Sequence, residues 1–371
     1  RFPEFSGEWK MCTIGELTTK VGSGVTPRGG EAVYKTEGHP FVRSQNVGLG
    51  NLLLDDIAFI DEETHLRQKN TELQFNDVLL NITGASIGRS ALVDKQIVGG
   101  NVNQHVCIIR TKENLVPSFI CSFLLSNYGQ RQIDSFQAGG NRQGLNFEQI
   151  KSIKITIPSK DEQIKIAKLL RAIDERIAIQ NKIIDKLQSL IKGLRVCCMQ
   201  RNGSDNVYLS EIAQIYQPQT ISSAELTEDG FLVYGANGII GKYKDYNHKT
   251  EQICITCRGN TCGMVNYTKP MSWITGNAMV INTDKYQDKV YKKYLYHYLS
   301  AYNFNSIISG SGQPQIVRTP LEKLKITLPT ISEQKQKAMI LDKIQDKIEI
   351  NHNVLNLYIL QKQYLLRQMF I

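Results

Sequence analysis

The stretch "KITIPSKDEQ" at Lys154–Gln163 recurs almost unchanged as "KITLPTISEQ" at Lys325–Gln334, 171 positions later. Each copy places a strand-like Lys-Ile-Thr before a proline, and then a Ser or Thr followed three residues later by Glu. This spacing is typical of a helix capping box. Each copy is therefore predicted to end a folded body and to start a helix.

The duplication extends through the whole chain, since the 171-residue offset continues from each motif to the last residue. Earlier segments also match, with drifting offsets: "GGNRQGL" with "GSGQPQI", "ITGASIG" from Ile82 with "CRGNTCG" from Cys257, "GNVNQHV" from Gly100 with "GNAMVIN" from Gly276, and "RSQNVG" from Arg43 with "YGANGI" from Tyr234. The matches predict two bodies, 1–158 and 207–329, two long helices, 159–200 and 330–371, and a linker at 201–206.

Each body is expected to be α+β. The segments "DVLLNITG", "QHVCIIRT", "QICITCRG" and "NAMVINT" have the pattern of buried or half-buried strands. The segments "PSFICSFLLSNYGQRQID" and "VYKKYLYHYLSAYNF" have the pattern of amphipathic helices.

The two long helices carry a heptad seam. Its a and d positions in the first helix are Leu170, Ile173, Ile177, Gln180, Ile184, Leu187, Ile191, Leu194 and Cys198. In the second they are Leu341, Ile344, Ile348, Asn351, Leu355, Tyr358, Lys362, Leu365 and Met369. The short linker favours antiparallel helices, because parallel ones would require the second body to bridge about 60 Å. Antiparallel pairing would bring Gln180 and Asn351 to one layer and fix the register, with the two bodies in a pseudo-twofold arrangement.

Further apolar residues lie outside the seam, and two interpretations of them stay open. They either pack on the bodies or form a docking surface. They are Ile164, Leu169, Ile179 and Ile183 in the first helix, and Ile340, Ile350, Val354 and Ile359 in the second.

The composition favours a polyanionic partner. Lys and Arg number 44 against 35 Asp and Glu, and the pI is about 9.0. No apolar stretch is long enough to span a membrane, and the chain begins without a signal-peptide pattern, so a cytoplasmic location is expected. The eight cysteines are expected to be reduced thiols.

Catalytic motifs are absent from the sequence. It has no Asn/Asp-Pro-Pro-aromatic methyltransferase motif and no nucleotide-binding Gly-x-x-x-x-Gly-Lys-Ser/Thr motif. Cys254, Cys257, Cys262 and His248 invite a zinc interpretation. The alternation of "QICITC" argues against it, because residues three apart in a strand face opposite ways, so no metal site is predicted.

The whole chain resembles the specificity subunit of Type I restriction-modification enzymes. The resemblance is carried by "RFPEFSGEW", "RSQNV", "DVLLNITGASIGR", "NVNQHV", "GSGQPQI" and the two helix starts. It implies two target recognition domains separated by an antiparallel coiled coil, in a protein that is not itself catalytic. Each domain would read one half of a split double-stranded DNA target. Two modification (methyltransferase) subunits and two restriction (motor-nuclease) subunits would join it, and S-adenosylmethionine, ATP and Mg²⁺ would belong to those partners.

The DNA-contact candidates are polar and basic residues of Gly-flanked loops, whose side chains suit base edges and phosphates. In the first body they are Arg43, Gln45, Asn46, Thr83, Arg89, Asn103, Gln104, Arg142 and Gln143. In the second they are Tyr234, Asn237, Lys242, Lys244, Arg258, Asn260, Gln313 and Gln315. Asn46 with Asn237, and Asn101 with Asn277, match between the copies and fit scaffold roles better than base contacts. Divergent positions such as Arg43 and Tyr234 fit base readout better.

Two other classes of function stay open at this stage. The chain could be a helical assembly scaffold that does not itself read DNA, or a nuclease or methyltransferase that acts alone. Methyl transfer to DNA, measured with and without a modification subunit, would separate these classes from a DNA reader.

Overall fold

The computed structural model describes residues 2–137, 144–199, 205–236, 238–310 and 312–370. The chain forms two compact units. The first unit consists of Arg1–Asn181 and Asn353–Ile371, and the second unit is Lys182–His352. The division falls within the two long helices, so each unit contains one body, the start of one helix and the end of the other.

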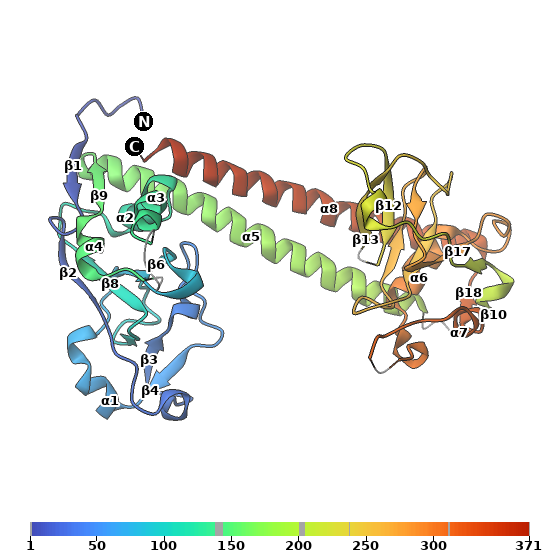
Figure 1. Ribbon diagram of the computed structural model, residues 1–371, viewed down its shortest axis with the longest axis horizontal. Helices are drawn as coiled ribbons and strands as arrows, with labels where there is room; N and C mark the ends of the chain where they lie inside the picture. Colours follow the sequence, from blue (N-terminus) through green and yellow to red (C-terminus); the bar gives the residue numbers. More distant parts are fainter. Residues whose placement is uncertain (1, 138–143, 200–204, 237, 311, 371) are drawn as a thin grey trace. The chain divides into compact units, whose positions relative to one another are not determined.

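Within the described residues, the body of the first unit contains three small sheets and four short α-helices. Figure 1 shows this body. One sheet has the order β2-β8-β5-β6, from strands Thr18–Ser23, Val106–Thr111, Val78–Asn81 and Ser90–Leu92. The second has the order β4-β3-β7, from Ala58–Ile60, His39–Val42 and Asn101–Val102, and the third pairs β1, Lys10–Thr13, with β9, Lys154–Ile157. The helices are α1 (Glu62–Arg67), α2 (Pro117–Leu124), α3 (Asn127–Ser135) and α4 (Phe147–Ser152).

The body of the second unit repeats this topology. The four-stranded sheet has the order β11-β17-β14-β15, from Gln214–Tyr216, Ala278–Asn282, Ile253–Thr256 and Val265–Tyr267. The three-stranded sheet is β13-β12-β16, from Gly238–Tyr243, Phe231–Gly235 and Trp273–Ile274, and β10 (Asp205–Tyr208) pairs with β18 (Lys325–Leu328). Helices α6 (Lys292–Ala301) and α7 (Arg318–Glu322) complete the body. The predicted duplication and α+β class are confirmed.

The four strands predicted from apolar runs are the central strands of the large sheets, because β5 pairs with β8 and β14 pairs with β17. The segment predicted as a single helix from Pro117 is instead two helices, α2 and α3. The break is local, because the Ser126 hydroxyl accepts a hydrogen bond from the Gly129 amide at 3.2 Å and starts a new helix.

The repeated motif starts each long helix as predicted. Helix α5 covers Lys160–Met199 and α8 covers Ile331–Gln368. The Ser159 hydroxyl accepts a hydrogen bond from the Glu162 amide at 3.4 Å, and Thr330 and Glu333 form a reciprocal capping box.

The glutamine of the motif has a further role, which the capping pattern alone does not predict. Gln163 is buried, and its side chain accepts from the Val116 amide at 2.9 Å and donates to the carbonyls of Asn114 and Pro158. Gln334 does the same in the second unit, accepting from the Tyr291 amide at 2.8 Å and donating to the carbonyls of Lys289 and Pro329. Each glutamine thus ties the start of a long helix to the segment that leads into α2 or α6.

The long helices pack against each other in antiparallel fashion within each unit. In the first unit Asp174 of α5 forms an ion pair with Lys362 of α8 at 2.6 Å, and Arg176, further along α5, lies over the ring of Tyr358, earlier along α8. Figure 1 shows the start of α5 beside the end of α8. In the second unit the seam residues Ile191, Leu341 and Ile348 form one apolar cluster with Leu187, Leu194 and Ile344. The predicted seam and helix direction are confirmed.

The predicted register pair stays a prediction, because Gln180 lies in the first unit and Asn351 in the second. Most of the apolar residues outside the seam do not pack on the bodies. Ile179 is 58% exposed and Ile350 is 60% exposed, and Ile183, Ile340 and Ile359 are also exposed. Across the described residues, we find no helix of the length and apolarity that a membrane span requires.

Candidate nucleic-acid interface

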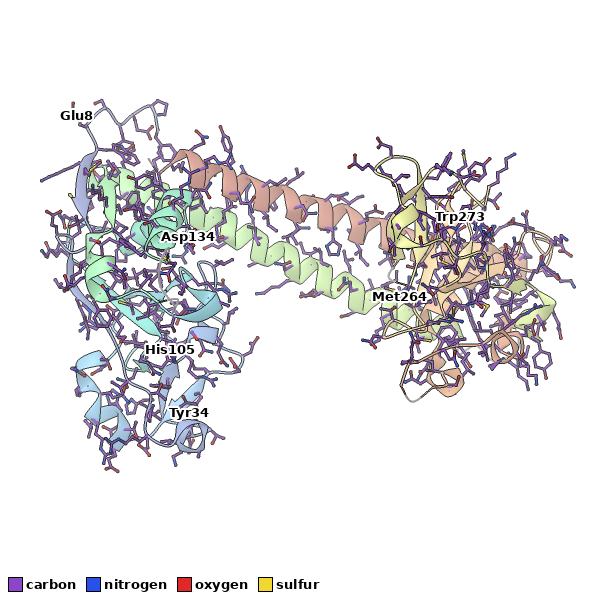
Figure 2. All side chains as sticks on the ribbon, in the orientation of Figure 1. Glu8, Tyr34, His105, Asp134, Met264 and Trp273 are labelled. Carbon is purple, nitrogen blue, oxygen red and sulfur yellow. The ribbon has the colours of Figure 1, made fainter. Side chains whose placement is uncertain are left out.

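Loops from three parts of the first body meet at one end of its large sheet. The Asn103 amide donates to the Val42 carbonyl at 3.1 Å, and the Ile82 amide donates to the His105 carbonyl at 3.0 Å. The Asn81 side chain donates to the Ser44 carbonyl at 2.8 Å. We call residues 24–26, 43–46, 82–89 and 103–105 the first loop cluster. In the view of Figure 2, His105 lies between Tyr34 and Asp134.

A chain of polar side chains runs through this cluster. The Gln104 side-chain oxygen accepts from the Thr26 amide at 3.0 Å, which fixes the orientation of the Gln104 amide. Its nitrogen lies 3.0 Å from His105 Nε2, which must therefore accept, and His105 Nδ1 carries the proton that it donates to Thr83 Oγ1 at 2.6 Å. These hydrogen bonds hold Thr83 and the exposed Gln104 next to each other in the first loop cluster.

Asp56 holds a second group of candidates in the first loop cluster. The Arg43 guanidinium donates to the Asp56 carbonyl at 2.7 Å and lies over the Tyr34 ring, 5.4 Å from its centroid. Gln45 also donates to the Asp56 carboxylate. The Asp56 carboxylate forms an ion pair with Arg43 at 3.4 Å and thus neutralises part of the charge that Arg43 would offer to DNA.

Two candidates of the first body have structural positions instead. Asn46 is fully buried, and its side chain donates to the Leu53 carbonyl and to Asp56 while accepting from the Arg43 amide. Asn103 is buried and accepts from the His105 amide at 3.1 Å. Both serve the loop backbone, so we correct their assignment as base contacts. Arg89 is exposed, and Arg142 and Gln143 lie outside the described residues.

The second body has an equivalent cluster. The hydroxyls of Thr256 and Thr261 both donate to the Ala236 carbonyl, at 2.8 and 2.7 Å. The Gln217 side chain donates to the Gly276 carbonyl, and the Ile316 amide donates to the Cys257 carbonyl at 3.0 Å. We call residues 217–220, 235–236, 257–263, 275–277 and 313–316 the second loop cluster.

Most candidates of the second body are exposed. Lys242 is ion-paired with Asp229 at 3.4 Å, and Lys244 lies near the ring of Tyr243. Arg258, Asn260, Gln313 and Gln315 are exposed in the second loop cluster, and Asn237 lies outside the described residues. Tyr234 is buried in an apolar cluster, and its hydroxyl accepts from the Lys269 amide at 3.1 Å. Burial raises the pKa of Tyr234, and this position corrects its assignment as a base reader.

Hydrogen bonds fix how the two clusters correspond. In the first unit the Leu145 amide donates to the Ile82 carbonyl, and in the second unit the Ile316 amide donates to the Cys257 carbonyl. The β-bridge between Thr83 and Gly144 likewise matches the β-bridge between Arg258 and Gln315. The predicted match of "ITGASIG" with "CRGNTCG" is therefore confirmed.

Two other predicted matches are wrong by a few residues. Asn103 donates to the carbonyl of Val42, whereas Thr275 donates to that of Tyr234. Tyr234 therefore corresponds to Val42 and not to Arg43. In the same register Asn277 corresponds to His105 and not to Asn101, because the Ile82 amide donates to the His105 carbonyl as the Cys257 amide donates to the Asn277 carbonyl. The loops of the two bodies differ in length, so the sequence alone does not show by how many residues these two matches are shifted.

The strand cysteines lie on opposite faces, as the alternation predicted. Cys254 belongs to one apolar cluster and Cys257 to another. Burial raises the pKa of the Cys254 thiol to about 12, so a thiolate ligand is disfavoured there. Within the described ranges, no three His, Cys, Asp or Glu side chains are grouped to hold a metal ion.

Comparison with known proteins gives one consistent answer. Residues 6–189 and 202–357 match the family described as the Type I restriction modification DNA specificity domain. The chain belongs to this family. It is 22% identical to a putative type I restriction enzyme MjaX specificity subunit from Methanocaldococcus jannaschii, over 94% of this chain and 89% of the relative. It is 32% identical to the EcoprrI specificity subunit from Escherichia coli, over 36% of this chain and 34% of that protein.

Solved structures show the same fold. The crystal structure of a Type I restriction-modification S subunit from M. genitalium superimposes with a TM-score of 0.67, at 16% identity, over 100% of this chain and 97% of that one. The chain is thus a Type I specificity subunit with two recognition domains, and its role is DNA target recognition. The polar loop clusters are the parts of this specificity subunit whose chemistry suits that role.

Proposed function

We propose that the first unit of this specificity subunit reads one half of a split DNA target, and that the second unit reads the other half. One observation supports the proposal most directly. The two units repeat one framework with matching hydrogen bonds, while the side chains at matching positions of their loop clusters differ, as between the half-buried Thr83 and the exposed Arg258. A duplicated framework with different exposed polar groups suits the reading of two different sequences.

A loop exchange tests this assignment. Residues 83–87 would be replaced by the sequence of residues 258–262, since the flanking hydrogen bonds are the same in both units. The variant is co-expressed with its modification subunit, and methylated sites are mapped by sequencing. One half of the recognised sequence should change and the other should stay. The reciprocal exchange is the control and should change only the other half.

The alternative of a scaffold that does not read DNA predicts a different result. Neither exchange would then alter the methylated sequence, and the complex would modify DNA without sequence preference. Methyl transfer by the isolated chain would instead support an enzyme that acts alone. We expect no such transfer, with S-adenosylmethionine, ATP and Mg²⁺ bound by the partner subunits.

The long helices are the docking surface that we infer for two modification subunits. Leu357 is 63% exposed and Leu360 is 59% exposed, on the same helix as the exposed Ile350 and Tyr364. Exposed apolar residues spaced along a helix usually mark an interaction surface. Leu357→Lys should weaken co-purification of the modification subunit by about tenfold or more. Gln361→Lys, which adds the same charge at an exposed position of α8, is the matched control.

The full complex would contain two modification and two restriction subunits, and native mass spectrometry of the purified complex tests this stoichiometry. We place the complex in the cytoplasm. The seven cysteines that lie free in the described part of the chain fit a reducing compartment.

A further inference from the structure

Arg258 in the second unit occupies the place that Thr83 occupies in the first. Each is the second residue after a strand and lies directly before the first Gly of a Gly-x-x-x-Gly loop, and each forms an antiparallel bridge with the residue before a buried Leu or Ile. The bridge partners are Gln315 for Arg258 and Gly144 for Thr83. The same backbone frame therefore presents an arginine beside a glutamine in one unit, and a threonine beside a glycine in the other.

The backbone around Arg258 is held on both sides. The Ile316 amide donates to the Cys257 carbonyl at 3.0 Å, and the Gly259 amide donates to the Pro314 carbonyl at 2.9 Å. These two bonds flank Arg258 and Gln315, which makes them a non-hydrogen-bonded pair with side chains close together on one face. A fixed backbone limits the conformational entropy that Arg258 would lose on binding.

Among the residues that the structure describes, no acid balances the charge of Arg258. Within the described residues, no carboxylate forms an ion pair with Arg258, whereas Arg318 nearby pairs with Glu322 at 2.7 Å. Arg258, Gln315 and Arg318 line one hollow of about 360 Å³ in the second unit. The exposed Arg258 guanidinium thus remains available to an acceptor group from outside the protein.

We propose that Arg258 recognises a guanine in the half-site of the second unit, donating two hydrogen bonds to O6 and N7 in the major groove. This inference rests on the proposed function, in which the second unit reads DNA. The planar guanidinium fork reaches both acceptors of guanine in one fixed geometry, whereas a lysine offers a single charged amine without the fork and a threonine offers one hydroxyl. The half-site read by the first unit lacks this contact, because Thr83 and Gly144 offer no such fork.

Two variants and one control test the inference in the complex with the modification subunit. Methylated sites are mapped on random-sequence DNA for the native chain, for Arg258→Lys and for Arg258→Ala. Discrimination for guanine at one position of the second half-site should fall by about 10- to 100-fold in Arg258→Ala, and by less in Arg258→Lys, which keeps a donor but loses the fork. Arg318→Ala is the control, since Arg318 lines the same hollow but is paired, and it should leave that position unchanged.

Two results would overturn the inference. The first is that the second half-site, assigned by the loop exchange, has no G·C pair at any fixed position. Alternatively, Arg258→Ala weakens all sites equally and lowers the salt dependence of binding by about one charge, which is the behaviour of a phosphate contact. In either case the loop exchange still alters one half-site. If the exchange alters neither half-site, the proposed function itself is wrong.

Discussion

The two units agree at the buried glutamines that start their long helices and differ at the bridges of their loop clusters. Gln163 and Gln334 each make three hydrogen bonds to equivalent backbone groups, and both are 1% exposed. At the loop bridge, the half-buried Thr83 and Gly144 of one unit are replaced by the exposed Arg258 and Gln315 of the other. A change at the buried glutamine would leave three backbone groups unsatisfied, whereas a change at the bridge leaves the flanking backbone hydrogen bonds in place and alters what the loop can bind.

The regions where the two long helices contact α2 in the first unit and α6 in the second, which we call the joints, also differ in chemistry. In the first unit the Asp174–Lys362 ion pair lies at a hollow of about 620 Å³ that Ser122 helps to line. The residue of α6 that corresponds to Ser122 is His297, which is buried between Asp342 of α8 and Arg195 of α5. The second joint therefore carries a buried histidine, which the first joint does not have at the corresponding position.

The largest effect is expected where the end of α8 enters the first body. Phe370 is 5% exposed and lies 5.2 Å from Phe119 and 5.9 Å from Phe123, measured between ring centroids. Phe370→Ala should lower the free energy of unfolding by about 3–5 kcal/mol. Chemical denaturation measures the loss. Tyr364→Ala, at a position 63% exposed, is the control and should change stability by less than about 0.5 kcal/mol. Equal effects of the two variants would contradict the packing of Phe370.

A matched pair of substitutions tests the shared framework more directly. Gln163→Leu leaves the Val116 amide and the carbonyls of Asn114 and Pro158 without partners, and Gln334→Leu does the same to its own three groups. Each should cost about 3 kcal/mol, measured by denaturant unfolding. Gln336→Leu, at an exposed position of α8, should cost little. A difference of more than about 1.5 kcal/mol between the two buried sites would show that the framework is not equivalent.

The sequence was sufficient for the parts of the fold that repeat. The offset of the two motifs, the heptad seam and the apolar runs predicted the two bodies, both long helices, their direction and the central strands. These features follow from periodicity and capping, which are local. The split between α2 and α3 was missed, because a single Ser126 cap interrupts an otherwise helical pattern.

The candidate site was harder to predict, because exposure depends on tertiary contacts. Asn46, Asn103 and Tyr234 have side chains suited to DNA, yet each is buried and satisfies groups of its own unit. The roles of Gln163 and His105 also lacked a signal, since their partners lie far away in sequence. For Gln163 the sequence shows only that a glutamine recurs at the same position in both helix starts, and this repetition does not identify its hydrogen-bond partners.

The smallest expected effect concerns pH and separates the two joints. His297 Nδ1 accepts from Arg195, and its Nε2–H donates to Asp342 at 2.9 Å. Burial lowers the pKa of His297, and the positive charges of Arg195 and Lys293 also lower it, although Asp342 opposes them. Below about pH 6.5 the unfolded chain therefore binds a proton that the folded second unit resists, and stability falls as the pH decreases.

We expect this loss to reach at most about 1.4 kcal/mol per pH unit, the limit for one proton. The free energy of unfolding would be measured between pH 5 and 8 for the native chain and for His297→Gln. Burial also lowers the pKa of His248, but His248 is present in both proteins, so the difference between their slopes isolates His297. The variant should lose less stability at low pH. Parallel slopes would mean that His297 binds its proton equally well in the folded and unfolded chain, and the joints would then differ in shape but not in their response to pH.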